Sequence, residues 1–214
     1  MFMLYALVVG FTIGLLVGGT PRRLAEFELR WAPLALVGLA VQIVLFSGPV
    51  SGAVGDLGPL IYVASTLAVV AVVARNVTTA RGFAIVALGA IANVAAIVAN
   101  GGYMPVTPGA LASSGHATAA GYSNSVAVAR PAFEALVDRF ALPAGLPFAN
   151  VFSVGDALIG LGIVLVIAAA MRPGATERRI AEAAGDASGH GTSRRPGSTT
   201  AGATSRAAGR AGQS

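Results

Sequence analysis

Residues 82–106 read GFAIVALGAIANVAAIVANGGYMPV, and this stretch decides the fold class. Its first 18 residues carry no charge, and Asn93 is their one polar side chain. A helix of that length rises about 27 Å, close to the ~30 Å hydrocarbon core of a bilayer. Gly and Pro then follow, and they favour a helix end because Gly supplies a left-handed cap and Pro cannot continue a helix. The stretch predicts a transmembrane helix followed by an extramembrane turn.

Four more apolar runs of similar length predict an all-α transmembrane bundle of five helices. The predicted spans are residues 2–19, 31–50, 57–74, 82–99 and 154–171, within a membrane domain of residues 1–172. The composition agrees, since 55% of the residues are hydrophobic and 11% are charged, against about 25% charged in a typical soluble domain. We therefore expect most of the surface to face a lipid bilayer.

The arginines predict the orientation of these spans. The flanks and loops that follow spans 1, 3 and 5 hold Arg22, Arg23, Arg30, Arg75, Arg81, Arg172, Arg178 and Arg179. The short loop after span 2 holds Asp56 and no arginine. Because basic loops stay on the cytoplasmic side, we expect a multi-pass protein of the cell membrane with its N-terminus outside and its C-terminus in the cytoplasm.

Two segments are predicted to lie outside the bilayer. In the outer loop, residues 100–153, Phe133, Leu136, Val137 and Phe140 share helical spacing, whereas Glu134, Asp138 and Arg139 face the other way. This pattern predicts a short amphipathic helix on the outer surface. The basic cytoplasmic tail, residues 173–214, is rich in Gly, Ala, Ser and Thr, which predicts disorder. It contains no aromatic residue, so a nucleic-acid partner is not expected.

Three glycines of span 1 recur every four residues: Gly10, Gly14 and Gly18. Glycine at this spacing lets a second helix approach closely in a membrane. We expect the partner to be another span of the same chain. The alternative is a seam between two copies of the chain in a homo-oligomer.

The polar residues near the outer end of the predicted bundle are the candidate ligand-binding residues: Asn93, Asn100, Gly101, Gly102, Tyr103, Asn150, Ser153 and Asp156. If the ends of the long loop meet, these residues form one pocket, suited to a neutral polar or cationic group. The alternative is purely structural. Ser153 and Asp156 have the spacing of a capping box, and the amides of Asn93 and Asn100 need hydrogen-bond partners within a membrane.

The sequence offers no set of catalytic residues. Cysteine is absent, and the two histidines, His116 and His190, stand apart, so we expect no metal site and no cofactor. The leading interpretation is a non-enzymatic membrane protein that binds a ligand or partner at its outer face. Two alternatives are a permease for small solutes or ions that acts as an oligomer, and a membrane enzyme that acts on lipid or cell-wall precursors.

The order of motifs resembles a bacterial family of membrane proteins known as domain of unknown function 5317. The likeness rests on a basic loop before Trp31, the run Asn100–Val106, Leu142-Pro143, and the run Asn150–Asp156 ahead of the last apolar span. It covers about residues 1–172. The resemblance implies a membrane architecture and no known activity.

Overall fold

The computed structural model describes residues 2–114 and 125–173. The chain divides into two units, Met1–Arg172 and Pro173–Ser214. Almost all of the second unit, with His190 and the predicted disordered tail, lies outside the described residues, as does His116. The helices and strands of the described residues all belong to the first unit.

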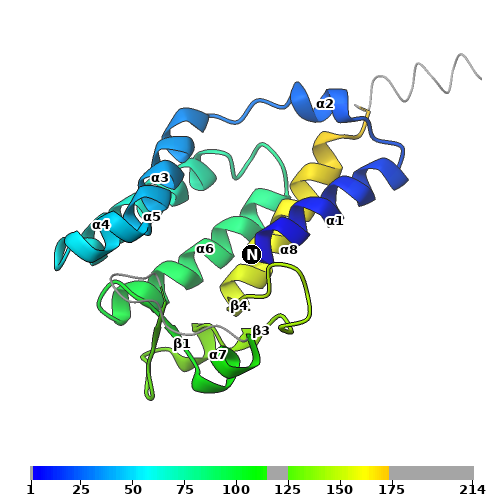
Figure 1. Ribbon diagram of the computed structural model, residues 1–214. Coiled ribbons are helices and arrows are strands. Elements are labelled where there is room, and N and C mark those ends of the chain that lie inside the picture. The colour runs from blue at the N-terminus through cyan, green and yellow to red at the C-terminus, as the bar shows by residue number, and fades with distance from the viewer. Residues whose placement is uncertain (1, 115–124, 174–214) are drawn as a thin grey trace, which may run out of the picture. The chain divides into compact units, whose positions relative to one another are not determined.

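Five apolar helices form where five spans are predicted (Figure 1). They are α1 (Phe2–Leu16), α3 (Ala32–Leu45), α5 (Leu57–Arg75), α6 (Gly82–Ala99) and α8 (Val154–Ala170). By length and composition, α5 and α6 are able to cross a membrane, which weakly suggests membrane association. The other three have 14 to 17 residues.

The two shortest of these helices end earlier than the predicted spans. After α1, Gly18 adopts a left-handed φ of 79°, and the short helix α2 (Pro21–Ala25) follows. After α3, Phe46 and the extended residue Ser47 separate Leu45 from a second short helix, α4 (Gly48–Ala53). A left-handed glycine ends a helix, and Pro49 is tolerated in the first turn of a new helix but not in the interior of a longer one. Hydropathy alone does not register either signal.

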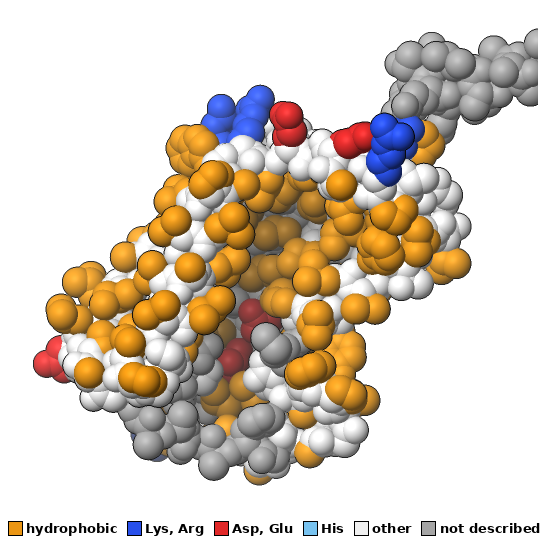
Figure 2. Space-filling model, turned by 45° about the horizontal axis from the view of Figure 1, so that its top comes forward, with side chains coloured by type: hydrophobic (Ala, Val, Ile, Leu, Met, Phe, Trp, Pro, Cys, Tyr) orange, Lys and Arg blue, Asp and Glu red, His pale blue; other side chains and the backbone are white. Residues whose placement is uncertain are grey.

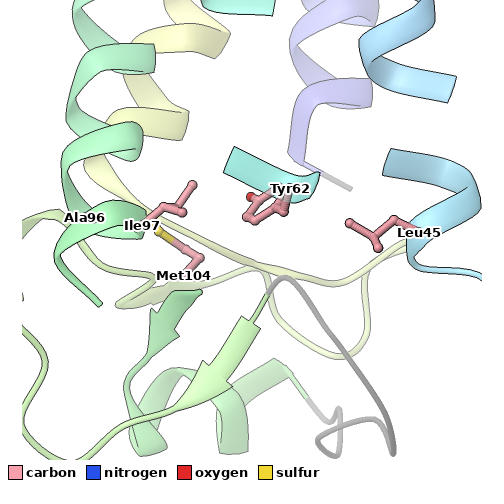
Figure 3. Close-up of a cluster of buried hydrophobic side chains, with 5 residues drawn as sticks. All are labelled: Leu45, Tyr62, Ala96, Ile97 and Met104. Carbon is pink, nitrogen blue, oxygen red and sulfur yellow. The ribbon is translucent and has the colours of Figure 1, made fainter. Parts of the chain in front are cut away.

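The five helices pack in the order α1–α8–α6–α5–α3. Helices α6 and α8 approach closely through glycines, because a Cβ atom at Gly82 or Gly89 would lie 2.8 or 2.9 Å from the backbone nitrogen of Val166 or Ile159. A hydrophobic cluster joins α3, α5 and α6 to the first strand, which follows α6 (Figure 3). Its buried members are Leu45, Tyr62, Ala96, Ile97 and Met104.

The segment between α6 and α8 corrects the all-α expectation. Strand β1 (Met104–Val106) pairs in parallel with β2 (Ser125–Ala127), and β3 (Phe140–Ala141) pairs antiparallel with β4 (Val151–Phe152). Helix α7 (Pro108–Ser114) follows β1. We call the described residues 104–114 and 125–152 the cap.

The prediction of an amphipathic helix through Phe133, Leu136, Val137 and Phe140 is wrong. The structure has only a 3-10 turn, η1 (Glu134–Leu136), between Phe133, with a left-handed φ of 52°, and Val137, which is extended. Beyond the turn, the backbone pairs with β1: Asp138 N–H donates to Pro105 O, and Thr107 N–H donates to Asp138 O. These long-range hydrogen bonds replace those that a helix would have made.

Candidate functional site

A network of hydrogen bonds joins the start of α8 to α6. The Asn93 amide donates from Nδ2 to Asp156 Oδ1 over 2.8 Å, and its Oδ1 accepts from Ser153 Oγ over 2.9 Å. At the start of α8, Asp156 N–H donates to Ser153 Oγ, and Ser153 N–H donates to Asp156 Oδ2. The predicted capping box is therefore formed, and it also binds Asn93.

Glycine makes this network possible. Gly155 lies directly against the Asn93 side chain, and a Cβ atom there would also lie 2.8 Å from Gly89 O. With only hydrogen on the Gly155 Cα, the two helices approach closely enough for the Asn93 amide to reach both Ser153 and Asp156. Ser153 has no exposed surface.

Asp138 of the cap is a second acidic residue near this network, and it is only 5% exposed. Its Oδ1 atom has no hydrogen-bond partner among the residues that the structure describes. Burial, and secondarily the negative charge of Asp156, raises the pKa of Asp138 from 3.8 to about 7. Burial acts in this direction because it disfavours the charged carboxylate.

The face of the described structure drawn in Figure 2 is hollowed. Figure 2 shows acidic side chains recessed between walls that are largely hydrophobic. The 3-10 turn η1, just before Asp138, contacts both α6 and α8. The cap therefore covers the end of the two helices at which the Asn93 network lies.

Asn100 and Tyr103 belong to a different place, a surface cavity of about 540 Å³. The cavity is lined by Ser51, Gly52, Gly55, Asp56, Asn100, Tyr103, Val126 and Val128. Asn100 also ties the end of α6 to the cap, because its amide donates to Ala132 O over 3.0 Å and accepts from Ala132 N–H over 2.9 Å. The cavity combines one carboxylate with an amide, a phenol and a hydroxyl.

The structure thus divides the candidate ligand-binding residues into two groups, Asn93–Ser153–Asp156 and Asn100–Tyr103. Gly101 and Gly102 both have a left-handed φ, and Gly102 packs against Pro59 at the start of α5. The Asn150 side chain is exposed, and its backbone oxygen accepts from Leu142 N–H.

The glycines of α1 differ in their surroundings. A Cβ atom at Gly10 would lie 2.9 Å from Val164 Cα of α8, and Gly14 lies against Met171 just after α8. A Cβ atom at Gly18 would meet none of the described atoms within 4 Å. Gly10 and Gly14 thus serve packing within the chain, whereas Gly18 lies past the end of the helix.

Sequence reasoning missed three residues that the structure makes prominent. Asp138 was expected on the polar face of a helix and is buried instead. Asp56 was considered only as a loop charge. Asn76, which has no exposed surface, links two connections, because its side chain donates to Arg30 O and Val72 O and accepts from Arg30 N–H. No local spacing identifies partners this far apart in sequence.

The described residues contain no group of three or more His, Cys, Asp or Glu side chains placed to hold a metal ion. In the comparison with known families, the model of a family of unknown function, DUF5317, matches residues 26–168. The chain belongs to this family. The DUF5317 match runs from the connection before α3 into α8, so it contains both groups of candidate residues. No curated protein and no solved structure matches the chain.

Proposed function

We propose that the chain is an integral membrane protein with five membrane-crossing helices, which binds a small cationic or neutral polar ligand at its outer face. Support for the membrane part comes from large aliphatic side chains that the fold leaves uncovered. Leu16 is 79% exposed, Ile43 is 74% exposed and Leu36 is 67% exposed. Lipid covers such surfaces, whereas contiguous apolar surface of this kind is rare on monomers in water. Helices α1 and α3, short for a ~30 Å core, cross where the bilayer thins locally.

The charge distribution supports the proposed orientation. Most of the basic side chains visible in Figure 2 gather at one end of the described structure. Arg22 and Arg23 lie in α2, Arg75 ends α5, and Arg81 directly precedes α6. This end is the cytoplasmic one under the positive-inside rule. The cap, with the cavity and the Asn93 network, is then outside.

The cavity beside Asn100 and Tyr103 is the observation that carries the binding proposal. Its volume, about 540 Å³, falls within the range of small-molecule sites. Asp56 supplies a negative charge, and no Lys or Arg is among the described residues that line it. An ammonium group matches a carboxylate beside an aromatic ring, whereas a phosphate would meet only repulsion from Asp56.

The experiment measures thermal unfolding of the purified protein in detergent with two probes, ethanolammonium and tetramethylammonium. Sodium phosphate at the same ionic strength is the anionic comparison. A bound cation stabilises the folded state by mass action, so we expect at least one ammonium probe to raise the unfolding midpoint.

Asp56→Asn is the decisive variant, and Glu134→Gln is the matched control, because Glu134 is an exposed acid in η1 and does not line the cavity. The Asp56 side chain makes no capping hydrogen bond to α5, so its replacement leaves that helix intact. Stabilisation should disappear in Asp56→Asn and persist in Glu134→Gln. Equal stabilisation of both variants, or none in the unmodified protein, would refute binding at this cavity.

A further inference from the structure

Asp138 holds a buried carboxyl group that the fold keeps in place. On one side its backbone N–H donates to Pro105 O over 2.9 Å, and on the other its carbonyl accepts from Thr107 N–H over 3.0 Å. Both partners belong to the strand β1 region, which is itself buried. These bonds hold the Asp138 segment against β1 within the cap, and because Asp138 is only 5% exposed, its carboxyl group reaches water only if the packing around it opens.

Among the described residues that pack around Asp138, none is a cation that pairs with its carboxyl group. Within the bounds of α6, α7, β1 and β3 there is no titratable side chain. Helix α8 contributes Asp156, which is already held by Asn93 and Ser153. The flanking residues Glu134 and Arg139 are both exposed, and the Arg139 guanidinium lies over the Phe140 ring at 6.0 Å.

Two features therefore coincide where the cap meets α6 and α8: a buried carboxyl group with an oxygen that has no hydrogen-bond partner among the described residues, and a second carboxyl group whose charge acts on it. An ionised carboxylate is costly in such a place, since it is 5% exposed and no cation among the described residues is paired with it. A proton removes the charge. It also converts one carboxylate oxygen into a hydrogen-bond donor.

We propose that Asp138, with Asp156 as its acidic neighbour, is a proton-binding site that couples closure of the cap over α6 and α8 to pH. The step is a simple equilibrium: the Asp138 carboxylate takes one proton from water when the cap packs, and returns it to water when the cap opens. No other bond forms or breaks. The site is separate from the Asp56 cavity and does not depend on any ligand there.

The direction of the pH effect follows from the raised pKa of Asp138. In the unfolded chain the group loses its proton near 3.8, whereas in the folded protein it keeps the proton until about pH 7. The folded state thus binds more protons between these values, and its stability must fall as the pH rises through this window. Above about pH 7, the stability that the bound proton contributes is fully lost.

Infrared spectroscopy of the detergent-purified protein tests the site directly, through the C=O stretch of a protonated carboxyl group. Between pH 5 and pH 9 the unmodified protein should lose one such band, with a midpoint near neutral pH. The band should be absent from Asp138→Asn and retained in the control Glu134→Gln. In Asp156→Asn it should remain but titrate at lower pH, because burial, the larger cause, is unchanged there.

Thermal unfolding over the same pH range gives an independent readout of coupling. The midpoint of the unmodified protein and of Glu134→Gln should fall as the pH rises to neutrality, and that of Asp138→Asn should change much less. If the unmodified protein has no carboxyl band that titrates in this range, or if the band survives in Asp138→Asn, the proposal is overturned. If Asp138→Asn fails to fold, Asp156→Asn still tests the site. A carboxyl band that titrates at the same pH in Asp156→Asn as in the unmodified protein would overturn the pairing of Asp138 with Asp156. Neither measurement involves an ammonium probe or an intact membrane, so failure here is distinct from failure of the proposed function.

Discussion

Replacing Gly155 by alanine tests the close contact that assembles the Asn93 network. The added methyl group would collide with the Asn93 side chain and would lie 2.8 Å from Gly89 O, a backbone atom that cannot move aside freely. The Asn93 amide would have to leave its place between Ser153 and Asp156. The substitution thus perturbs helix packing and hydrogen bonding together.

The expected cost follows from these two effects. Overpacking a tight interface costs about 1–3 kcal/mol, and losing the two hydrogen bonds of Asn93 costs about 0.5–1.5 kcal/mol each. Alanine recovers about 0.5–1 kcal/mol relative to glycine in a helix. We expect Gly155→Ala to destabilise the protein by about 1–5 kcal/mol, measured by reversible unfolding in mixed detergent micelles and followed by circular dichroism.

Two further variants make the result specific. Gly109→Ala is the matched control, because Gly109 lies in a helix and a Cβ atom there would meet none of the described atoms within 4 Å; it should leave stability unchanged or slightly raised. In an Asn93→Ala background, Gly155→Ala should cost less than it does alone, since the side chain that it strikes is gone. An unaltered unfolding curve for Gly155→Ala would refute the contact between α6 and α8 as described.

Three other outcomes are expected in the same unfolding assay. Asn76→Ala should cost about 2–4 kcal/mol, because it leaves buried backbone groups of Arg30 and Val72 without partners; a cost below about 0.5 kcal/mol would contradict this. Gly10→Leu should destabilise the chain even when it is monomeric, since Gly10 packs on Val164; a loss confined to a dimer would instead indicate a seam between copies. At pH 8, Asp138→Asn should stabilise the protein by at most about 4 kcal/mol, the equivalent of a pKa raised from 3.8 to about 7; destabilisation at that pH would argue that the carboxylate is needed.

The sequence predicts the helical part of the fold well because its strongest signals are local. The apolar run of α6 matches its helix at both ends, and that of α5 differs by one residue. The ends of α1 and α3 depend on the left-handed Gly18 and on the extended Ser47 ahead of Pro49, and the average hydropathy of a span does not reveal such local breaks. A count of apolar residues therefore makes both spans too long.

Prediction fails where distant residues decide the structure. The spacing of Phe133 to Phe140 is helical, yet Asp138 pairs with the backbone of Pro105 and Thr107. The same error placed Asp138 on a solvent-facing side, although it is buried.

The candidate site shows the same division between local and distant signals. The capping box of Ser153 and Asp156 is readable from a spacing of three residues, but Asn93, which completes the network, is 60 residues away from Ser153. The single pocket expected at the ends of the loop is two separate places, because Asn100 turns to Ala132 and the Asp56 cavity.

Sidedness is the central claim of the proposed function, and cysteine labelling measures it most directly because the chain has no cysteine of its own. Gly145 in the cap and Thr78 between α5 and α6 are both exposed, and a Cβ atom at Gly145 would meet none of the described atoms within 4 Å. In intact spheroplasts, Gly145→Cys should react with a membrane-impermeant maleimide, and Thr78→Cys should react only after lysis. Labelling of Thr78→Cys in intact spheroplasts, with Gly145→Cys protected until lysis, would contradict the account.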